Sequence, residues 1–221
     1  MIFIKEQSLN KVWRKAVKKL MENGYTPQDD RFVKMESIAI EIDNPKIEDI
    51  DEYFPMTQED INIINNYITT GENEEKVCHE WTKLYYHRLF DEPNSQIKYI
   101  INRIKAGRAG IASNWLKQDQ NSKIKPCMMS ITANNENGKL FFNLHARACD
   151  VYNKLLMNLQ EFITLQYYIA EKTNLEVGRF TMFIDYGQIL RVNEKLWYQT
   201  VNVHWMFLQK WERRRKIYGS L

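Results

Sequence analysis

The segment LLMNLQEFITLQYYIAEK, residues 155–172, constrains the fold of this chain more than any other feature of its sequence. Its apolar residues recur at the spacing of an α-helix and predict one broad buried face. That face comprises Leu156, Leu159, Ile163, Tyr167 and Ala170. Because apolar residues also occupy much of the remaining helix surface, one partner cannot cover it. We therefore expect this helix to lie in the middle of a domain, with other elements packed around it.

The length of 221 residues fits one domain over residues 1–221, and a chain of this size buries about 70% of its unfolded surface. It therefore needs neither a disulfide framework nor a structural metal. The sequence has no apolar run near the roughly 20 residues that span a bilayer, and it begins without the pattern of a signal peptide. Three cysteines suit a reducing compartment, so we expect a cytoplasmic protein. The net charge of +3 is too small to indicate a nucleic-acid partner.

The order of the predicted elements indicates the fold class. Apolar periodicity and end signals predict helices over residues 8–23, 57–69, 76–90 and 95–105, and again after residue 190, where the chain ends in a basic tail. Alternation and composition predict strands over residues 32–42, 110–116, 127–133, 139–146 and 180–190. Asn137-Gly138 predicts a hairpin turn between two of them. This order is typical of an α+β domain with a mixed or mostly antiparallel sheet.

Neither a Gly-rich phosphate loop nor a paired zinc-ligand motif occurs in the sequence. His79 and His87 are eight residues apart, which is too far along a helix to share a metal ion easily. We therefore expect no metal site. The basic run at 213–216 could contact nucleic acid or could be a solvated helix end.

Four residues could carry chemistry. Cys127 follows Pro126 at the start of a predicted strand, where nearby cations would lower the pKa of its thiol; alternatively, it is a small buried strand residue. Arg147 and Asp150 could form a phosphate-binding fork held by a carboxylate, or a surface ion pair of little energetic consequence. Arg108 could be a second phosphate ligand on the same reasoning.

Asn158 lies on the buried face of the apolar helix. A buried amide must satisfy two donors and two acceptor lone pairs. This residue therefore either reads a bound base or belongs to a packing network, and its type alone does not decide between these roles.

These residues together resemble the thymidylate synthase superfamily, which includes thymidylate synthases and pyrimidine hydroxymethylases. Its hallmark is Pro-Cys, then an Arg three residues before an Asp, with an Asn eight residues after that Asp. The segments that carry the likeness are LYYHRL (84–89), KAGRAGIASNWL (105–116), KPC (125–127), RACDVYNKLLMN (147–158) and NLEVGRF (174–180). It extends over about residues 80–190.

The resemblance implies a homodimer and a mechanism. The Cys127 thiolate would add to carbon 6 of a pyrimidine nucleotide, and carbon 5 would then attack the one-carbon unit of 5,10-methylenetetrahydrofolate. Arg147, with Arg108 of the partner subunit, would hold the nucleotide phosphate. Asn158 would bind the edge of a uracil base, and Asp150 would help to place the folate.

The resemblance also implies roles for three further residues. Tyr85 matches a substrate-binding position, and Asp185 begins the element that binds the sugar. Glu59 lies at roughly the family's distance before Trp81 and would be the catalytic glutamate, although Glu80 fits in another register.

Several positions depart from the family pattern. Ala148 replaces a serine that binds phosphate, Ala109 replaces the second arginine of a pair, and Met128 replaces the usual histidine after the cysteine. The histidine and tyrosine that should follow Asp185 are also missing. Two functions therefore remain open: a nucleotide methyl- or hydroxymethyltransferase, and a catalytically degenerate homodimer that serves as a nucleotide-binding or protein-interaction scaffold.

Overall fold

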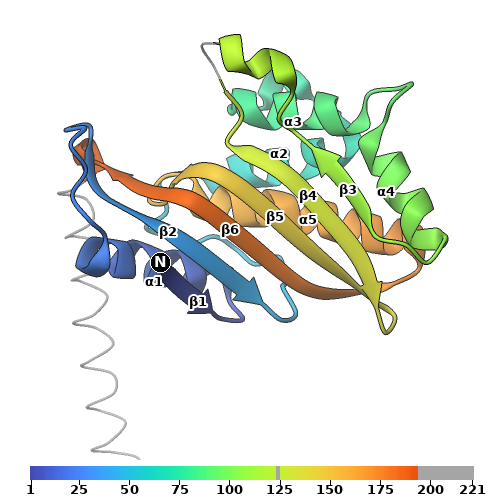
Figure 1. Ribbon diagram of the computed structural model, residues 1–221, viewed down its shortest axis with the longest axis horizontal. Helices are drawn as coiled ribbons and strands as arrows, with labels where there is room; N and C mark the ends of the chain where they lie inside the picture. The colour runs from blue at the N-terminus through green and yellow to red at the C-terminus, as the bar shows by residue number, and fades with distance from the viewer. Residues whose placement is uncertain (123–124, 194–221) are drawn as a thin grey trace, which may run out of the picture.

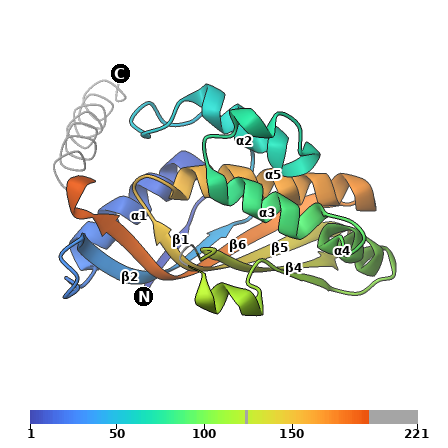
Figure 2. The same cartoon turned by 90° about the horizontal axis from the view of Figure 1, so that it is seen from above.

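The computed structural model describes residues 1–122 and 125–193 as a six-stranded mixed sheet with α-helices on one face (Figures 1 and 2). The strands are β1 (Ile2–Lys5), β2 (Phe32–Ile42), β3 (Gly110–Ser113), β4 (Met128–Glu136), β5 (Lys139–Asp150) and β6 (Glu176–Leu190). The helices are α1 (Leu9–Asn23), α2 (Gln58–Thr70), α3 (Glu80–Phe90), α4 (Gln96–Lys105) and α5 (Leu155–Thr173). The strand order is β1-β2-β6-β5-β4-β3, which confirms the predicted α+β class with a mixed sheet.

The apolar helix predicted to be central is α5, and it connects the parallel strands β5 and β6. Every residue from Leu155 to Ile163 is buried. It contacts α1, α2 and α4 as well as both strands. Tyr167 is an exception to the predicted buried face, because its side chain is 40% exposed and its hydroxyl donates to the Pro45 carbonyl oxygen at 2.9 Å. A phenol keeps its polar end where a partner or water is available.

Local signals in the sequence account for most element ends. The Ser8 hydroxyl caps α1, and Thr57 caps α2 in a reciprocal pair with Asp60. Asn137 and Gly138 have φ angles of 53° and 82°, the positive values that a tight hairpin between β4 and β5 requires.

Several sequence predictions differ from the structure. The strand predicted over residues 110–116 ends at Ser113, and the one predicted over residues 127–133 spans Met128–Glu136. The strands predicted over residues 139–146 and 180–190 are longer, spanning Lys139–Asp150 and Glu176–Leu190.

The helix expected from residue 76 begins only at Glu80, because Asn73 adopts a left-handed conformation and Glu74–Lys76 form a separate 3₁₀ turn. Strand β1 was not predicted, since four residues are too few for alternation to stand out. It forms because Ile2 and Ile4 are buried while the backbone pairs in parallel with β2.

The α-helices lie on one face of the sheet (Figure 2). Phe3, Ile111 and Phe183 are exposed, and the alternation of burial along β1, β3 and β6 places their side chains on the opposite face. A shallow hollow on this face is lined by Ser130, Thr132, Asn143, Leu144, His145, Thr181 and Phe183. Within the described residues, no helix is long and apolar enough to cross a membrane. The basic run at 213–216, with its predicted helix, lies outside the described residues.

Gly110 allows α4 to approach β3 closely. A Cβ atom placed there would lie 2.8 Å from the Cα atom of Ile100. We predict that Gly110→Ala lowers the free energy of unfolding by about 1–3 kcal/mol, because the backbone of α4 must move. Urea denaturation measures this change. Gly107→Asn is the matched control, since a side chain there meets no atom within 4 Å and Asn tolerates the φ of 69°. Equal stability of the two variants would contradict the prediction.

Candidate active site

The candidate active site lies where three segments meet: the end of β5, the start of α5 and the residue before β4. The Arg147 amide donates to the Cys127 carbonyl oxygen at 2.8 Å, and an Arg147 guanidinium nitrogen lies 3.9 Å from the Cys127 sulfur. Asn158 places its amide 3.6 Å from the sulfur of Cys149. The Cys149 thiol in turn interacts electrostatically with both Cys127 and Asp150. The structure thus brings together four residues predicted from the sequence: Cys127, Arg147, Asp150 and Asn158.

Tyr85 fixes the backbone at the candidate nucleophile. Its hydroxyl oxygen accepts hydrogen bonds from the amides of Cys127 and Met128, both at 3.2 Å. The ring is buried against Phe162 of α5, with the ring centroids 5.8 Å apart. Burial raises the pKa of the Tyr85 phenol, so it remains a neutral acceptor of these two bonds.

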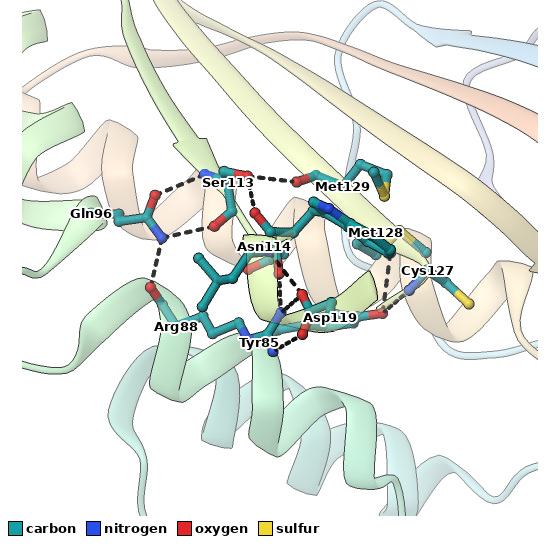
Figure 3. Close-up of polar contacts among 11 residues, drawn as sticks. Tyr85, Arg88, Gln96, Ser113, Asn114, Asp119, Cys127, Met128 and Met129 are labelled. Atoms are coloured by element: carbon teal, nitrogen blue, oxygen red, sulfur yellow. Dashed lines mark hydrogen bonds and ion pairs between the residues drawn. The ribbon is translucent and has the colours of Figure 1, made fainter. Parts of the chain in front are cut away.

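Arg88, one turn after Tyr85 on α3, anchors the segment that leads into β4 (Figure 3). Its guanidinium forms two hydrogen bonds with Asp119, at 2.7 and 2.8 Å, and a third with the Asn114 carbonyl oxygen. The Arg88 guanidinium lowers the pKa of the Asp119 carboxyl, which also accepts the Leu116 amide. The fork geometry of arginine suits this arrangement.

Gln96, from the first turn of α4, joins the two helices to the sheet (Figure 3). Its amide nitrogen donates to the carbonyl oxygens of Arg88 and Ser113, and its oxygen accepts the Ser113 amide at 2.8 Å. Helices α3 and α4 therefore hold the chain on both sides of the site with polar contacts.

The Cys127 thiol is half-buried, directly before β4. Burial raises its pKa, and the opposing effect of the Arg147 guanidinium is smaller. Arg147 thus lowers this pKa as expected, but burial raises it by more, so the expectation of a lowered pKa is wrong. The alternative of a buried strand residue is also wrong, because Cys127 precedes the strand.

Arg147 and Asp150 do not form the predicted fork, nor a surface ion pair. The Asp150 carboxylate instead accepts the side-chain and backbone amides of Asn153, at 2.6 and 3.2 Å, and burial raises its pKa. The Nε atom of Arg147 is buried without a hydrogen-bond partner among the described residues. Alternation along β5 explains the separation, since residues three apart leave a strand on opposite faces.

A buried carboxyl group was missed in the sequence. Glu161 is fully buried on α5, and neither of its carboxylate oxygens has a hydrogen-bond partner among the described residues. Burial raises its pKa to about 8, while the neighbouring Thr82 hydroxyl and Lys154 ammonium act in the opposite direction. A glutamate inside the most apolar helix of the chain was the signal that could have identified it.

Three predicted residues lie apart from this cluster. Glu59 is exposed in the first turn of α2, beside a hollow lined by Asn62, Ile63, Asn66, Glu72, Asn73 and Lys76. Asp185 is bonded to His145, with the His145 Nε2 atom 3.1 Å from each carboxylate oxygen. Arg108 is exposed before β3. Among the described residues, no group of three or more His, Cys, Asp and Glu side chains could hold a metal ion.

Comparison with known proteins gives one consistent result. The thymidylate synthase family model matches residues 47–195. A Methanocaldococcus jannaschii protein named "Putative thymidylate synthase" is 25% identical over 194 residues, covering 82% of this chain and 87% of that protein. A protein of the same name from Methanothermobacter marburgensis is 25% identical over 201 residues, covering 83% and 90%. The thermostable thymidylate synthase A from Bacillus subtilis shares the fold, with a TM-score of 0.68 at 15% identity over 89% of this chain and 84% of that chain.

The contact of Tyr85 with two amides is testable by removing one oxygen atom. We predict that Tyr85→Phe lowers the free energy of unfolding by about 1–3 kcal/mol, because two backbone N–H groups lose their acceptor. Chemical denaturation measures the loss. Tyr99→Phe, at a 49% exposed position on α4, should leave stability unchanged. A Tyr85→Phe variant as stable as the wild type would contradict this assignment.

Glu161 should make stability depend on pH. Its pKa is raised from 4.5 to about 8 in the folded state, so the folded protein holds a proton that the unfolded chain releases. Its contribution is complete below pH 4.5 and is lost as the pH rises to about 8. We predict that Glu161→Gln removes this decline in denaturation midpoints measured across the range. Glu171→Gln, at an exposed position of the same helix, should retain it. Parallel curves for wild type and Glu161→Gln would refute the prediction.

Proposed function

Because this chain belongs to the thymidylate synthase family, we propose that it transfers a one-carbon unit to carbon 5 of a pyrimidine nucleoside monophosphate. The observation that carries the proposal is the Cys127 thiol, whose sulfur lies 3.9 Å from the Arg147 guanidinium while Tyr85 fixes its backbone. A nucleophile held by its backbone and placed beside a cation is the arrangement that covalent catalysis by cysteine requires.

The Cys127 sulfur forms a bond to carbon 6 of the base. The electron pair of the carbon 5–carbon 6 double bond moves toward the carbonyl oxygen at carbon 4, which makes carbon 5 nucleophilic. Methylenetetrahydrofolate, which Asp150 helps to place, would supply the one-carbon unit as its methylene carbon–nitrogen bond breaks. The hydrogen on carbon 5 would then leave as a proton. A thiol with a raised pKa gives a small thiolate fraction at neutral pH, but each thiolate is a stronger nucleophile.

Asn158 recognises the edge of the base. Within the described residues its side-chain amide donates only to the sulfur of Cys149, at 3.6 Å. A thiol sulfur is a weak acceptor, so exchange of this bond for one to a carbonyl oxygen of the base is favourable. This contact supports a uracil base, as in deoxyuridylate.

The active unit is a homodimer, in which Arg108 of the partner subunit joins Arg147 at the phosphate. Gly110, two residues after Arg108, pairs with Ala133, whereas Cys127 adjoins Met128 at the other end of β4. The five residue steps from Met128 to Ala133 span about 17 Å, so the chain's own Arg108 lies far from its Cys127. The uncovered face of the sheet, with Ile111 and Phe183 exposed, supports pairing of two copies there. We place this reaction in the cytoplasm.

Release of tritium from carbon 5 of labelled nucleotides tests the proposal. Deoxyuridylate, deoxycytidylate and the two ribonucleotides are compared, each with and without methylenetetrahydrofolate. We expect release from a uracil nucleotide with the wild type and none with Cys127→Ala, because no other thiol can replace the attack on carbon 6. Cys78→Ala, which removes an exposed cysteine, should release tritium at the wild-type rate. Undiminished release by Cys127→Ala would refute the mechanism.

The second candidate is a non-catalytic dimer that binds a nucleotide or another protein. The raised pKa of Cys127 favours it, because a thiol protonated at neutral pH is unreactive, and Asp185 is bonded to His145 rather than free for a sugar. In that case no nucleotide releases tritium although the protein is folded and dimeric. Alkylation of Cys127 at neutral pH would then be no faster than that of the buried Cys149.

A further inference from the structure

His87, on α3, lies at the centre of a polar cluster that has no role in the mechanism above. Its Nε2 atom lies 2.9 Å from a carboxylate oxygen of Glu74, and its Nδ1 atom lies 3.1 and 3.2 Å from the two carboxylate oxygens of Asp91. The same Glu74 oxygen accepts the hydroxyl of Tyr67 on α2 at 2.5 Å. Glu74 belongs to the 3₁₀ turn between the two helices, and Asp91 directly follows α3. This cluster therefore joins α2, α3 and the segment between them.

The geometry of the cluster requires a particular protonation state of the His87 ring. A neutral imidazole has one N–H donor and one acceptor nitrogen, whereas an imidazolium has two donors. An ionised carboxylate can only accept. Because each ring nitrogen of His87 faces a carboxylate, both contacts are hydrogen bonds only when the ring is doubly protonated. Loss of one proton leaves a nitrogen lone pair facing a carboxylate oxygen, which is repulsive.

The titratable groups around the ring and its two partners come from α2, the 3₁₀ turn and α3, and they are Tyr67, Glu74, Lys83, Tyr86 and Asp91. Burial lowers the pKa of His87, but the hydrogen bonds to Asp91 and Glu74 raise it by more, so this pKa lies above its ordinary value of 6.5. The Tyr67 hydroxyl and the His87 ring both lower the pKa of the Glu74 carboxyl. Burial raises the pKa of Tyr67 and of Tyr86, so both phenols stay neutral. The ring is 48% exposed, so it exchanges protons with solvent.

The segment between α2 and α3, residues 71–79, has little else to hold it in place. Val77 is its only buried residue. Glu74 is the residue whose side chain bonds it to both helices. A segment with few buried contacts opens at a lower free-energy cost than the elements that flank it. Removal of the bond between Glu74 and His87 therefore shifts this segment toward an open state.

We propose that His87 is a pH-dependent latch, which holds residues 71–79 against α2 and α3 when its ring is protonated and releases them when the ring is neutral. The inference goes beyond the proposed function and does not rest on it. The contribution of the latch to stability is complete below pH 6.5 and is lost as the pH rises through the higher pKa of the folded protein. Release also changes the wall of the hollow beside α2, which Glu72, Asn73 and Lys76 line.

His145 provides an internal reference for this behaviour. Its Nε2 atom lies 3.1 Å from each carboxylate oxygen of Asp185. One proton on that nitrogen satisfies the contact, so the His145 ring can keep its hydrogen bond in the neutral state. The His87 ring cannot keep both of its bonds in that state.

Hydrogen–deuterium exchange of the full-length protein tests the latch. Exchange is followed by mass spectrometry from about pH 5.5 to about pH 9 and is divided by the intrinsic rate at each pH. We expect the protection of residues 71–79 to fall by about three- to tenfold as the pH rises, the scale of two exposed ion pairs. Protection of the buried helix α5 serves as the reference for global unfolding.

Two variants should remove this pH dependence. His87→Gln has no titrating ring. Glu74→Gln places a carboxamide beside the ring, and a carboxamide can donate to a neutral ring as well as accept from a protonated one. The matched control is Glu75→Gln, an exposed position in the same 3₁₀ turn, which should retain the wild-type pH dependence.

Proton NMR of the histidine rings identifies the group that titrates. The His87 ring should titrate above pH 6.5, and Asp91→Asn should lower its midpoint. Equal pH dependence of residues 71–79 in the wild type and His87→Gln would overturn the latch, because another group would then control the segment. Protection that stays constant while the His87 ring titrates, or that follows the midpoint of His145 instead, would also overturn it. None of these results depends on tritium release, so they are separate from the test of the transferase.

Discussion

The burial of α5 from Leu155 to Ile163 determines much of what surrounds it. A helix covered by a sheet on one side and by other helices on the rest must account for every polar side chain it carries. Gln160 donates to the Glu48 carbonyl oxygen, and Gln166 donates to the carbonyl oxygens of Leu140 and Gly178, so these two residues attach a loop and two strands to the helix. The Asn158 amide donates only to the Cys149 sulfur, and the Glu161 carboxylate oxygens have no hydrogen-bond partner, among the residues that the structure describes. The buried polar residues of α5 therefore differ in whether they attach other elements to the helix.

Helix α3 provides the framework of the site from the other side. Tyr85 and Arg88 lie one turn apart on this helix. The Tyr85 hydroxyl accepts the Cys127 amide, and the Arg88 guanidinium donates to Asp119, so these polar groups are bonded to protein rather than to water. The Asp119 carboxylate and the Arg88 guanidinium are nearly excluded from solvent, with 4% and 14% of their side chains exposed. Loss of one partner of such a pair leaves a buried charge, so its geometry is strongly constrained. The position of Cys127 therefore depends on contacts made by residues about forty positions earlier in the sequence.

Sequence patterns predicted the helix caps and turns, which depend on neighbouring residues. They were less successful for side-chain contacts and pKa values, which depend on burial in the folded chain. The caps at Ser8 and Thr57 and the turn at Asn137 are local, and all three were predicted correctly. The resemblance to the thymidylate synthase superfamily implied that Cys127, Arg147 and Asn158 belong together. Spacing could not reveal that Arg147 and Asp150 point apart, or that burial raises the pKa of Cys127, since both depend on neighbours distant in sequence. Glu161 was overlooked for the same reason.

The two outermost strands, β1 and β3, contain only four residues each. Short edge strands offer few unpaired backbone amides and carbonyls to another chain. Natural sheets limit edge-to-edge aggregation in this way. The long strands β5 and β6 lie in the interior of the sheet, where both of their borders are paired. Pairing of another chain along either edge of the sheet is therefore disfavoured, whereas the sheet face opposite the helices offers a larger surface for contact.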